Sequence, residues 1–163
     1  MGGYGSGRPQ EKHTVEACKV LSAGMLQRNK LLREGVFNFA TLTWTNTATG
    51  EDVSSIACLV YTIDATRVIR LYYSITETGE NIEYPVRLTT TPLPWGGVRW
   101  AFLCPGGNCG RVCRKLYLPP RGRYFACRLC YRLTYTSSQE AHKFDRFYRQ
   151  LGITPTQAKD MFG

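Results

Sequence analysis

The sequence predicts an α+β protein in which helices flank an antiparallel β-meander. Two patterns indicate this class. Between residues 35 and 103, runs rich in Val, Ile, Thr and aromatic residues are separated by short turns, which is typical of consecutive antiparallel strands. On both sides of this region, apolar residues recur at helical spacing behind residues that favour helix N-termini. Hydrophobic residues make up 43% of the 163-residue chain, which is enough for a folded core.

The first 34 residues divide into two parts. Residues 1–12 are rich in Gly and predict a flexible tail. Residues 13–34 predict a helical pair, with Thr14 as the cap of the first helix and Ser22 before the second. Two short helices in tandem also fit a helix-turn-helix, but any helical hairpin gives the same pattern. The pair therefore indicates no function by itself.

Five segments within residues 35–103 predict strands joined by short connections. In chain order they span residues 37–46, 53–63, 68–76, 82–89 and 98–103. The region holds four basic and six acidic residues and no cluster of reactive side chains. We therefore interpret this antiparallel sheet as a scaffold, with a sheet edge that pairs with a partner strand as the alternative.

Positive charge is concentrated in the second half of the chain. The net charge is +9, and residues 104–150 alone hold ten basic and two acidic side chains. A positive field on one segment favours a polyanion, either a nucleic acid or an acidic protein face. A solvated basic surface that serves solubility is the plainer alternative.

Seven cysteines occur in a chain whose first residues lack the apolar segment of a signal peptide. We therefore expect a cytoplasmic protein, in which cysteines are more often metal ligands or buried thiols than disulfides. The apolar runs, such as residues 56–61, are too short to span a membrane.

Four of the cysteines are spaced for a metal site. Cys104 and Cys109 form one pair, and Cys127 and Cys130 form a second. Zn²⁺ prefers four such soft ligands in a tetrahedron, so we predict one structural zinc ion bound by these four residues. A shell filled by protein ligands leaves no open position for a substrate or a catalytic water. Cys113 is an alternative ligand, because four residues rather than the usual two separate the first pair.

The segment between the two pairs predicts the hairpin of a zinc ribbon. Residues 111–118 and 123–126 predict two strands around a turn at 119–122. Pro and Gly in the first cysteine turn allow it to fold back, so that backbone amides point at the sulfurs. We expect the ribbon to span residues 104–135, inserted between the sheet and the C-terminal helices.

Residues 136–163 predict C-terminal helices. Ser137 and Glu140 match a capping box at the start of the first of them. A basic face is expected to carry His142, Arg146 and Arg149, with Lys143 nearby.

Parts of the chain resemble an uncharacterised zinc-ribbon family of bacteria, phages and mobile elements. The similar segments are residues 102–105, 109–111, 115–118, 124–131, 133–135 and 138–139, together with the Gly-rich opening and residues 88–92. Members of that family tend to have a two-residue first knuckle and no cysteine at the place of Cys113, so this chain departs from the pattern there and at Gly106 and Gly107. The resemblance implies a zinc-bound bacterial or phage protein and implies no activity.

We expect a nucleic-acid-binding accessory protein that uses a basic, aromatic surface. Arg and Lys contact phosphates, and aromatic rings stack on unpaired bases. The predicted contacts are Arg111, Arg114, Lys115, Arg121, Arg123, Arg128, Arg132, Lys143, Arg146 and Arg149. The aromatic residues among them are Tyr117, Tyr124, Phe125, Tyr131 and Tyr135, at least half of which we expect to pack the ribbon onto its neighbours.

The sequence does not distinguish DNA from RNA, and it leaves a second function open. The alternative is a protein–protein adaptor or inhibitor of a host nucleic-acid machine, such as RNA polymerase or a CRISPR-type defence effector, because Arg and Tyr serve both kinds of interface. An enzyme is not expected, since the two histidines, His13 and His142, are far apart and no zinc-deaminase, Walker or Gly-x-Ser-x-Gly motif is present. Nor do we expect a membrane partner or a small-molecule substrate.

Overall fold

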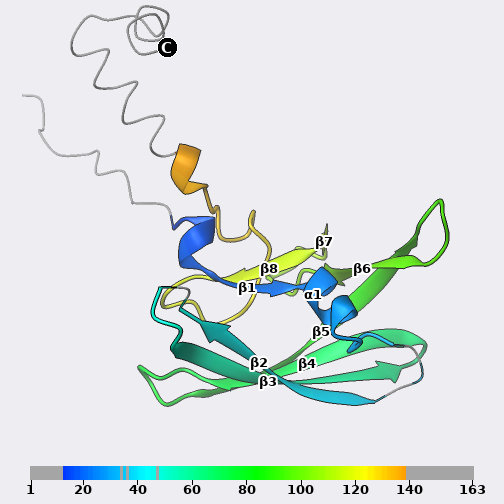
Figure 1. The fold of residues 1–163 in the computed structure, drawn as a ribbon, viewed down its shortest axis with the longest axis horizontal. Helices are drawn as coiled ribbons and strands as arrows, with labels where there is room; N and C mark the ends of the chain where they lie inside the picture. Colours follow the sequence, from blue (N-terminus) through cyan, green and yellow to red (C-terminus); the bar gives the residue numbers. More distant parts are fainter. Residues whose placement is uncertain (1–12, 34, 36, 47, 139–163) are drawn as a thin grey trace, which may run out of the picture. The chain divides into compact units, whose positions relative to one another are not determined.

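The computed structural model describes residues 13–138 except 34, 36 and 47. The chain divides into two compact units, one formed by Cys18–Tyr131 and the other by Met1–Ala17 with Arg132–Gly163. The larger unit is mostly antiparallel β-structure with little helix (Figure 1). The described part of the chain contains no helix long and apolar enough to cross a lipid bilayer.

A six-stranded antiparallel sheet forms the greater part of the larger unit. Its strands follow each other in space as they do in the chain: β2 (Asn38–Thr45), β3 (Asp52–Ile63), β4 (Thr66–Ser74), β5 (Asn81–Pro92), β6 (Val98–Leu103) and β7 (Val112–Cys113). The predicted meander is therefore confirmed, and each of the five predicted strands lies within three residues of its expected bounds. Runs rich in β-branched and aromatic residues, separated by turn-forming residues, were sufficient to locate these strands.

Strand β5 changes partner halfway along its length. Residues Asn81 to Arg87 pair with β4, whereas Leu88 to Pro92 pair with β6. The β5–β6 hairpin consequently continues beyond the β4 ladder, and it projects from the sheet in Figure 1. Two backbone hydrogen bonds close its tip, from the N–H of Leu93 to the carbonyl of Gly97 and from the N–H of Gly96 to the carbonyl of Leu93, both 3.1 Å long.

Part of the segment predicted as a helical pair forms a strand of a second, two-stranded sheet. Val15–Ala17 forms only a 3-10 turn, and the chain then enters strand β1 (Lys19–Ser22), which pairs antiparallel with β8 (Lys115–Leu118). The first predicted helix is wrong because pairing with a distant strand outweighs a weak local helical pattern. The second is present as a short helix, α1 (Ala23–Arg28), which begins directly after Ser22 as expected.

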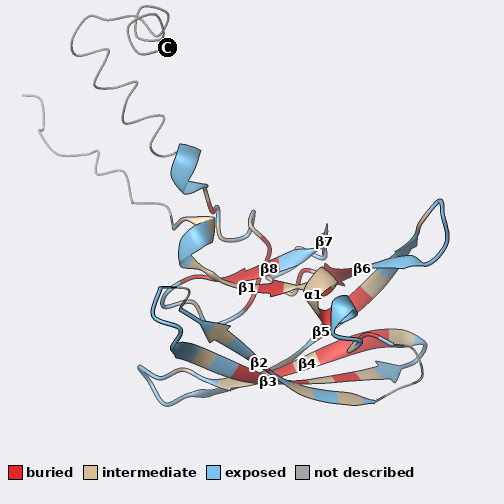
Figure 2. Ribbon diagram, viewed as in Figure 1, coloured by how far each residue is buried: buried red, intermediate tan, exposed pale blue. Residues whose placement is uncertain are grey.

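The core lies between the large sheet and the elements that pack on it, and the buried residues gather there in Figure 2. One cluster joins Leu26 of α1, Leu71 of β4, Phe102 of β6 and Leu116 of β8. Phe125 is fully buried in the same cluster. Its ring stacks on Trp44 at a centroid distance of 5.9 Å and meets the edge of Tyr73 at 6.0 Å. The segment that follows β8 is thus part of the main core.

The smaller unit is described for residues 13–17 and 132–138. The N–H of Val15 donates to the carbonyl of Thr134 at 2.9 Å, and the N–H of Thr134 donates to the carbonyl of His13 at 3.2 Å. The Glu16 carboxylate accepts hydrogen bonds from the backbone and the hydroxyl of Thr136. The predicted tail and residues 139–163, which include nearly all of the predicted C-terminal helices, lie outside the described residues.

We predict that Phe125→Ala lowers the free energy of unfolding by about 3–5 kcal/mol, because it empties a fully buried site beneath the stacked Trp44 ring. Urea unfolding of the metal-loaded protein measures this loss. Phe37→Ala is the matched control, since that ring is 71% exposed, and it should change stability by less than about 0.5 kcal/mol. A loss below about 1 kcal/mol for Phe125→Ala would contradict the packing described here.

Candidate metal centre

The first cysteine pair lies in the loop that joins β6 to β7. The strands end in the pairs Phe102–Cys113 and Leu103–Val112, and the Cys104 N–H continues the ladder by donating to the carbonyl of Arg111 at 2.9 Å. Inside the loop, the Cys109 N–H donates to the carbonyl of Gly106 at 3.0 Å. Cys104 therefore lies at the end of the β6–β7 ladder, and a tight turn places Cys109 beside it.

The second pair follows one β-bridge. Tyr117 and Ala126 exchange backbone hydrogen bonds of 2.8 and 3.1 Å, and Cys127 comes directly after this bridge. The N–H of Tyr131 donates to the carbonyl of Cys127 at 3.4 Å, which turns the chain so that Cys130 returns toward Cys127. The bridge thus fixes where the second knuckle begins.

The structure does not confirm the predicted ribbon hairpin, because residues 123–126 form no strand and take part only in the single bridge Tyr117–Ala126. The segment predicted as one strand over residues 111–118 is broken at Arg114 into β7, which pairs with β6, and β8, which pairs with β1. The carbonyl of Arg114 accepts from the N–H of Ala23 at 3.0 Å, so the break itself is held by α1. Residues 104–131 belong to the same compact unit as the sheet.

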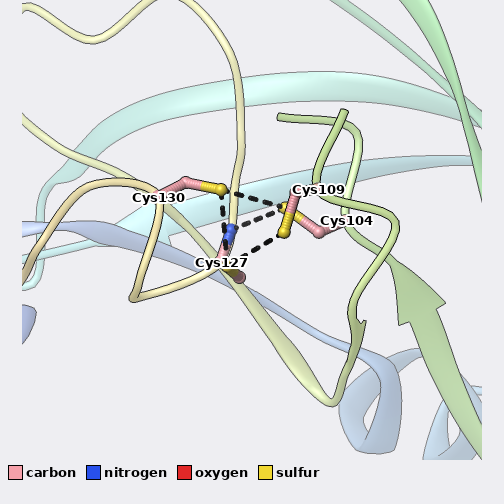
Figure 3. A group of neighbouring side chains, drawn as sticks. All are labelled: Cys104, Cys109, Cys127 and Cys130. Carbon is pink, nitrogen blue, oxygen red and sulfur yellow. Dashed lines mark hydrogen bonds between the residues drawn. The ribbon is translucent and has the colours of Figure 1, made fainter. Parts of the chain in front are cut away.

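The four sulfurs of the two pairs converge as predicted (Figure 3). All four Sγ atoms lie within 4.8 Å of one another, and the separations are 3.8 Å for Cys104–Cys130, 3.9 Å for Cys109–Cys127 and 3.6 Å for Cys127–Cys130. A tetrahedron with metal–sulfur bonds near ~2.3 Å has edges of about 3.8 Å. The arrangement therefore fits one tetrahedral metal ion with four sulfur ligands.

Gly106 makes room for this convergence. A Cβ atom at this position would lie 3.0 Å from the Cys130 Sγ and 3.1 Å from the Ala126 Cβ, both tighter than ordinary contacts. Gly107 and Gly110 have φ angles of 49° and 55°, which L side chains rarely adopt. The longer first knuckle is thus a loop whose glycines let it fold over the sulfurs. The sequence drew attention to these glycines but could not show that Gly106 touches a ligand of the opposite pair.

The surroundings of the sulfurs differ from one to the next. Cys104 and Cys127 are buried, and Cys130 is exposed. The backbone N–H of Arg111 lowers the pKa of Cys109 to about 7, whereas burial raises the pKa of Cys104. Protons on these thiols would compete with a cation, and a metal ion shared by four sulfurs favours the thiolate form of each.

Cys113 is not one of the four clustered sulfurs. Its side chain packs against the core from β7, and its Sγ lies 3.8 Å from the carbonyl oxygen of Phe102. Burial raises the pKa of Cys113 to about 12. Cys58 is also buried, on β3, with a pKa raised to about 11. Cys58 is thus a buried thiol and Cys113 a half-buried one, and neither belongs to the sulfur cluster.

The predicted basic contacts are mostly exposed. Arg111, Arg114, Lys115, Arg121 and Arg123 are exposed on the larger unit. Arg128 is half-buried there, Arg132 is exposed on the smaller unit, and Lys143, Arg146 and Arg149 lie outside the described residues. Arg123 forms an ion pair with Glu80, and its guanidinium lies 5.9 Å from the centre of the Tyr124 ring. The structure therefore offers a basic surface in which the charge of Arg123 is already partly compensated.

The aromatic residues of this segment divide between core and surface. Tyr117 and Phe125 are buried and therefore cannot stack on a ligand, which corrects their assignment as potential stacking residues. Tyr131 is half-buried and donates its hydroxyl to the carbonyl of Tyr124. Tyr124 and Tyr135 are 46% and 43% exposed. Packing thus accounts for three of the five rings when the half-buried Tyr131 is included, in line with the expectation of at least half.

A cavity of about 550 Å³ lies away from the cysteines, between the β3–β4 turn and the β5–β6 hairpin. Thr62, Thr66, Leu88 and Trp100 are among its lining residues, and so is Arg67, whose buried guanidinium donates to the Thr62 hydroxyl at 3.0 Å. The four clustered cysteines take no part in this lining.

Comparisons of the chain with protein-family models, with curated proteins and with solved structures gave no match. The resemblance to a zinc-ribbon family therefore stays a prediction. The function has to be argued from the geometry and chemistry of this chain's own residues.

We predict that Cys127→Ser abolishes stoichiometric metal binding, because a hydroxyl replaces one of four thiolates in the cluster. Cys113→Ser, which changes a sulfur outside the cluster, should keep one metal ion per chain. Elemental analysis of the purified variants measures both. A Cys127→Ser protein that retains one metal ion, or a Cys113→Ser protein that loses it, would show that the ligands are misassigned.

We predict that Gly106→Ala weakens metal binding, because the added methyl group must displace the Cys130 sulfur or the Ala126 side chain. Gly24→Ala in α1 is the matched control, since its Cβ meets Arg114 at an ordinary 3.5 Å and Ala favours a helix. Competition with a chromogenic chelator gives the two affinities. Equal affinities for wild-type protein and Gly106→Ala would exclude the close approach described above.

Proposed function

We propose that this protein is a non-catalytic zinc-ribbon protein that binds nucleic acid through the basic surface around its metal centre. Zinc is the ion that best suits four thiolates in a tetrahedron, because it requires no open position and undergoes no redox change. Bound there, it would hold the β6–β7 loop and the segment after Ala126 together. The four cysteines fill its shell, so the ion supplies structure rather than chemistry.

One observation supports the nucleic-acid proposal most directly. Between Glu83 and Glu140 the chain contains no Asp or Glu, while it contains nine basic residues, eight of them Arg. This stretch includes the second half of β5, the whole of β6 and both cysteine pairs. A surface with one sign of charge attracts a polyanion and steers its approach. Arg supplies planar donors that suit phosphate oxygens.

The local contacts leave much of this charge available. Arg111, Arg114, Lys115 and Arg121 have no salt bridge with any carboxylate in the described part of the chain, where the ion pairs are Arg123–Glu80 and Arg70–Glu83. Arg111 belongs to the first cysteine loop, and Arg121 lies in the 119–122 turn with a positive φ of 63°. Metal binding would therefore fix the backbone that carries these side chains, and metal removal should weaken nucleic-acid binding.

A protein-binding role is the second candidate, and strand β2 favours it. This strand is the first in the sheet order, so one of its edges has no strand neighbour in the described residues. Its eight residues include no charged side chain, although edge strands commonly carry charges that prevent pairing with other chains. A partner strand could add to this edge, as an adaptor or inhibitor of a larger host complex would require.

We predict that the double substitution Arg111→Ala/Arg121→Ala weakens nucleic-acid binding and makes it less dependent on salt. Each lost phosphate contact should lower the slope of log affinity against log salt by about 0.7–0.9. Fluorescence titration of the zinc-loaded protein against labelled oligonucleotides, at several salt concentrations, measures both quantities.

Arg70→Ala is the matched control for this series, because Arg70 is already paired with Glu83 on the sheet at 2.8 Å. It should leave the slope unchanged. An unchanged slope for the double variant as well would argue against the metal-proximal surface as the contact, and no binding by the wild-type protein would argue for the protein-binding role.

A further inference from the structure

The tip of the β5–β6 hairpin presents an isolated tryptophan. Trp95 is 95% exposed, which makes it the most exposed large hydrophobic side chain in the described part of the chain. Trp44 and Trp100, by contrast, are packed against the core or within it. Leaving an aromatic ring in water forgoes the stabilisation that burial of a large apolar side chain gives. Folding of the chain therefore provides no reason for an indole at this position.

The backbone of the turn that carries this ring is closed by hydrogen bonds. The hydrogen bonds that link Leu93 with Gly96 and Gly97 close the turn on either side of Trp95. Gly96 and Gly97 have φ angles of 90° and 80°, so the turn uses conformations that glycine adopts without strain. Below the tip, Trp100 is buried and anchors the hairpin in the core. Because the turn is already closed, binding at its tip need not order the backbone.

Positive charge accompanies the ring. Arg99 is exposed on β6 opposite Thr91, near the tip of the same hairpin. The side chain of Gln27 in α1 donates to the carbonyl of Val98 at 3.1 Å, which brings the end of α1, with the exposed Arg28, close to the tip of the hairpin. The hairpin also lies within the stretch that contains no Asp or Glu. An aromatic face flanked by cations suits a ligand with flat rings and negative charges.

We infer that Trp95 is a stacking platform for an unpaired base, so that the nucleic acid bound by this protein is single-stranded. The inference rests on the proposed function and specifies its ligand. An indole can stack only on a base whose face is not already covered, and a duplex covers those faces with neighbouring base pairs. A protein hot spot is usually ringed by further contacts that exclude water, whereas Pro94, Gly96 and Gly97 beside Trp95 are small and exposed.

The test compares single- and double-stranded oligonucleotides of one length, chosen to exceed the ~4–16 nucleotides that a small binding fold covers. Zinc-loaded wild-type protein, Trp95→Ala, Trp95→Phe and the control Phe37→Ala, whose ring is 71% exposed on the β-sheet unit, are titrated at fixed salt. Trp95→Ala should reduce affinity for the single strand by about 5- to 150-fold, the range expected for loss of one base stack. Trp95→Phe should restore most of that affinity, and Phe37→Ala should leave it unchanged.

The same titrations give a second signal from the protein itself. Stacking on a base quenches indole fluorescence, so single-stranded oligonucleotide should quench the wild-type protein and quench Trp95→Phe much less. Because Trp95 has almost no contacts to lose, the variants should fold as the wild-type protein does, which thermal unfolding verifies.

Four results would overturn the inference. If the protein binds single strands and Trp95→Ala binds them equally well, or if it prefers the duplex, the ligand assignment fails while the proposed function stands. If neither form binds at physiological salt, the proposed function fails, and the inference with it. If Trp95→Ala instead abolishes self-association in analytical ultracentrifugation, the ring serves a second copy of the chain.

Discussion

The convergence of four cysteine sulfurs is the constraint on which the larger unit depends. The sulfurs come from the loop after β6 and from the segment after the Tyr117–Ala126 bridge, so one ion bound by them would join the last hairpin of the six-stranded sheet to the chain that follows β8. Structural zinc contributes about 10–16 kcal/mol to the folding of isolated zinc fingers, whereas whole domains are stable by only about 5–15 kcal/mol. Cys104 and Cys127 also belong to the hydrophobic core cluster. Loss of the ion would therefore affect the core as well as the loops.

Between residues 111 and 125, the chain buries an aromatic ring and exposes its arginines. Phe125 turns inward to stack on Trp44, while Arg111, Arg114 and Arg121 remain at the surface. Because the ring packs in the core and the guanidinium groups stay in solvent, the segment presents a basic face on a packed support. The positive charge also favours the thiolates, since four of them carry more negative charge than one divalent cation neutralises. The basic residues therefore fit both the metal centre and a polyanionic ligand.

Regular patterns in the sequence predicted the parts of the structure that depend on local rules. Runs of strand-forming residues between turns located β2 to β6, and the paired cysteines located the sulfur cluster. The failures all involve distant partners. Lys19–Ser22 forms a strand because β8, almost a hundred residues later, is there to pair with it, and the segment 111–118 breaks because its halves find different neighbours. Neither the contact of Gly106 with the Cys130 sulfur nor the exposure of Trp95 has a signature in the sequence alone.

X-ray absorption spectroscopy at the zinc edge of the loaded protein tests the central claim most directly, because it reports the atoms bound to the ion. Four thiolates at the corners of one tetrahedron predict a single shell of four sulfur atoms at about 2.3 Å. A shell that includes nitrogen or oxygen at about 2.0–2.1 Å would contradict it, since such an ion would have a histidine, carboxylate or water ligand and fewer than four cysteines.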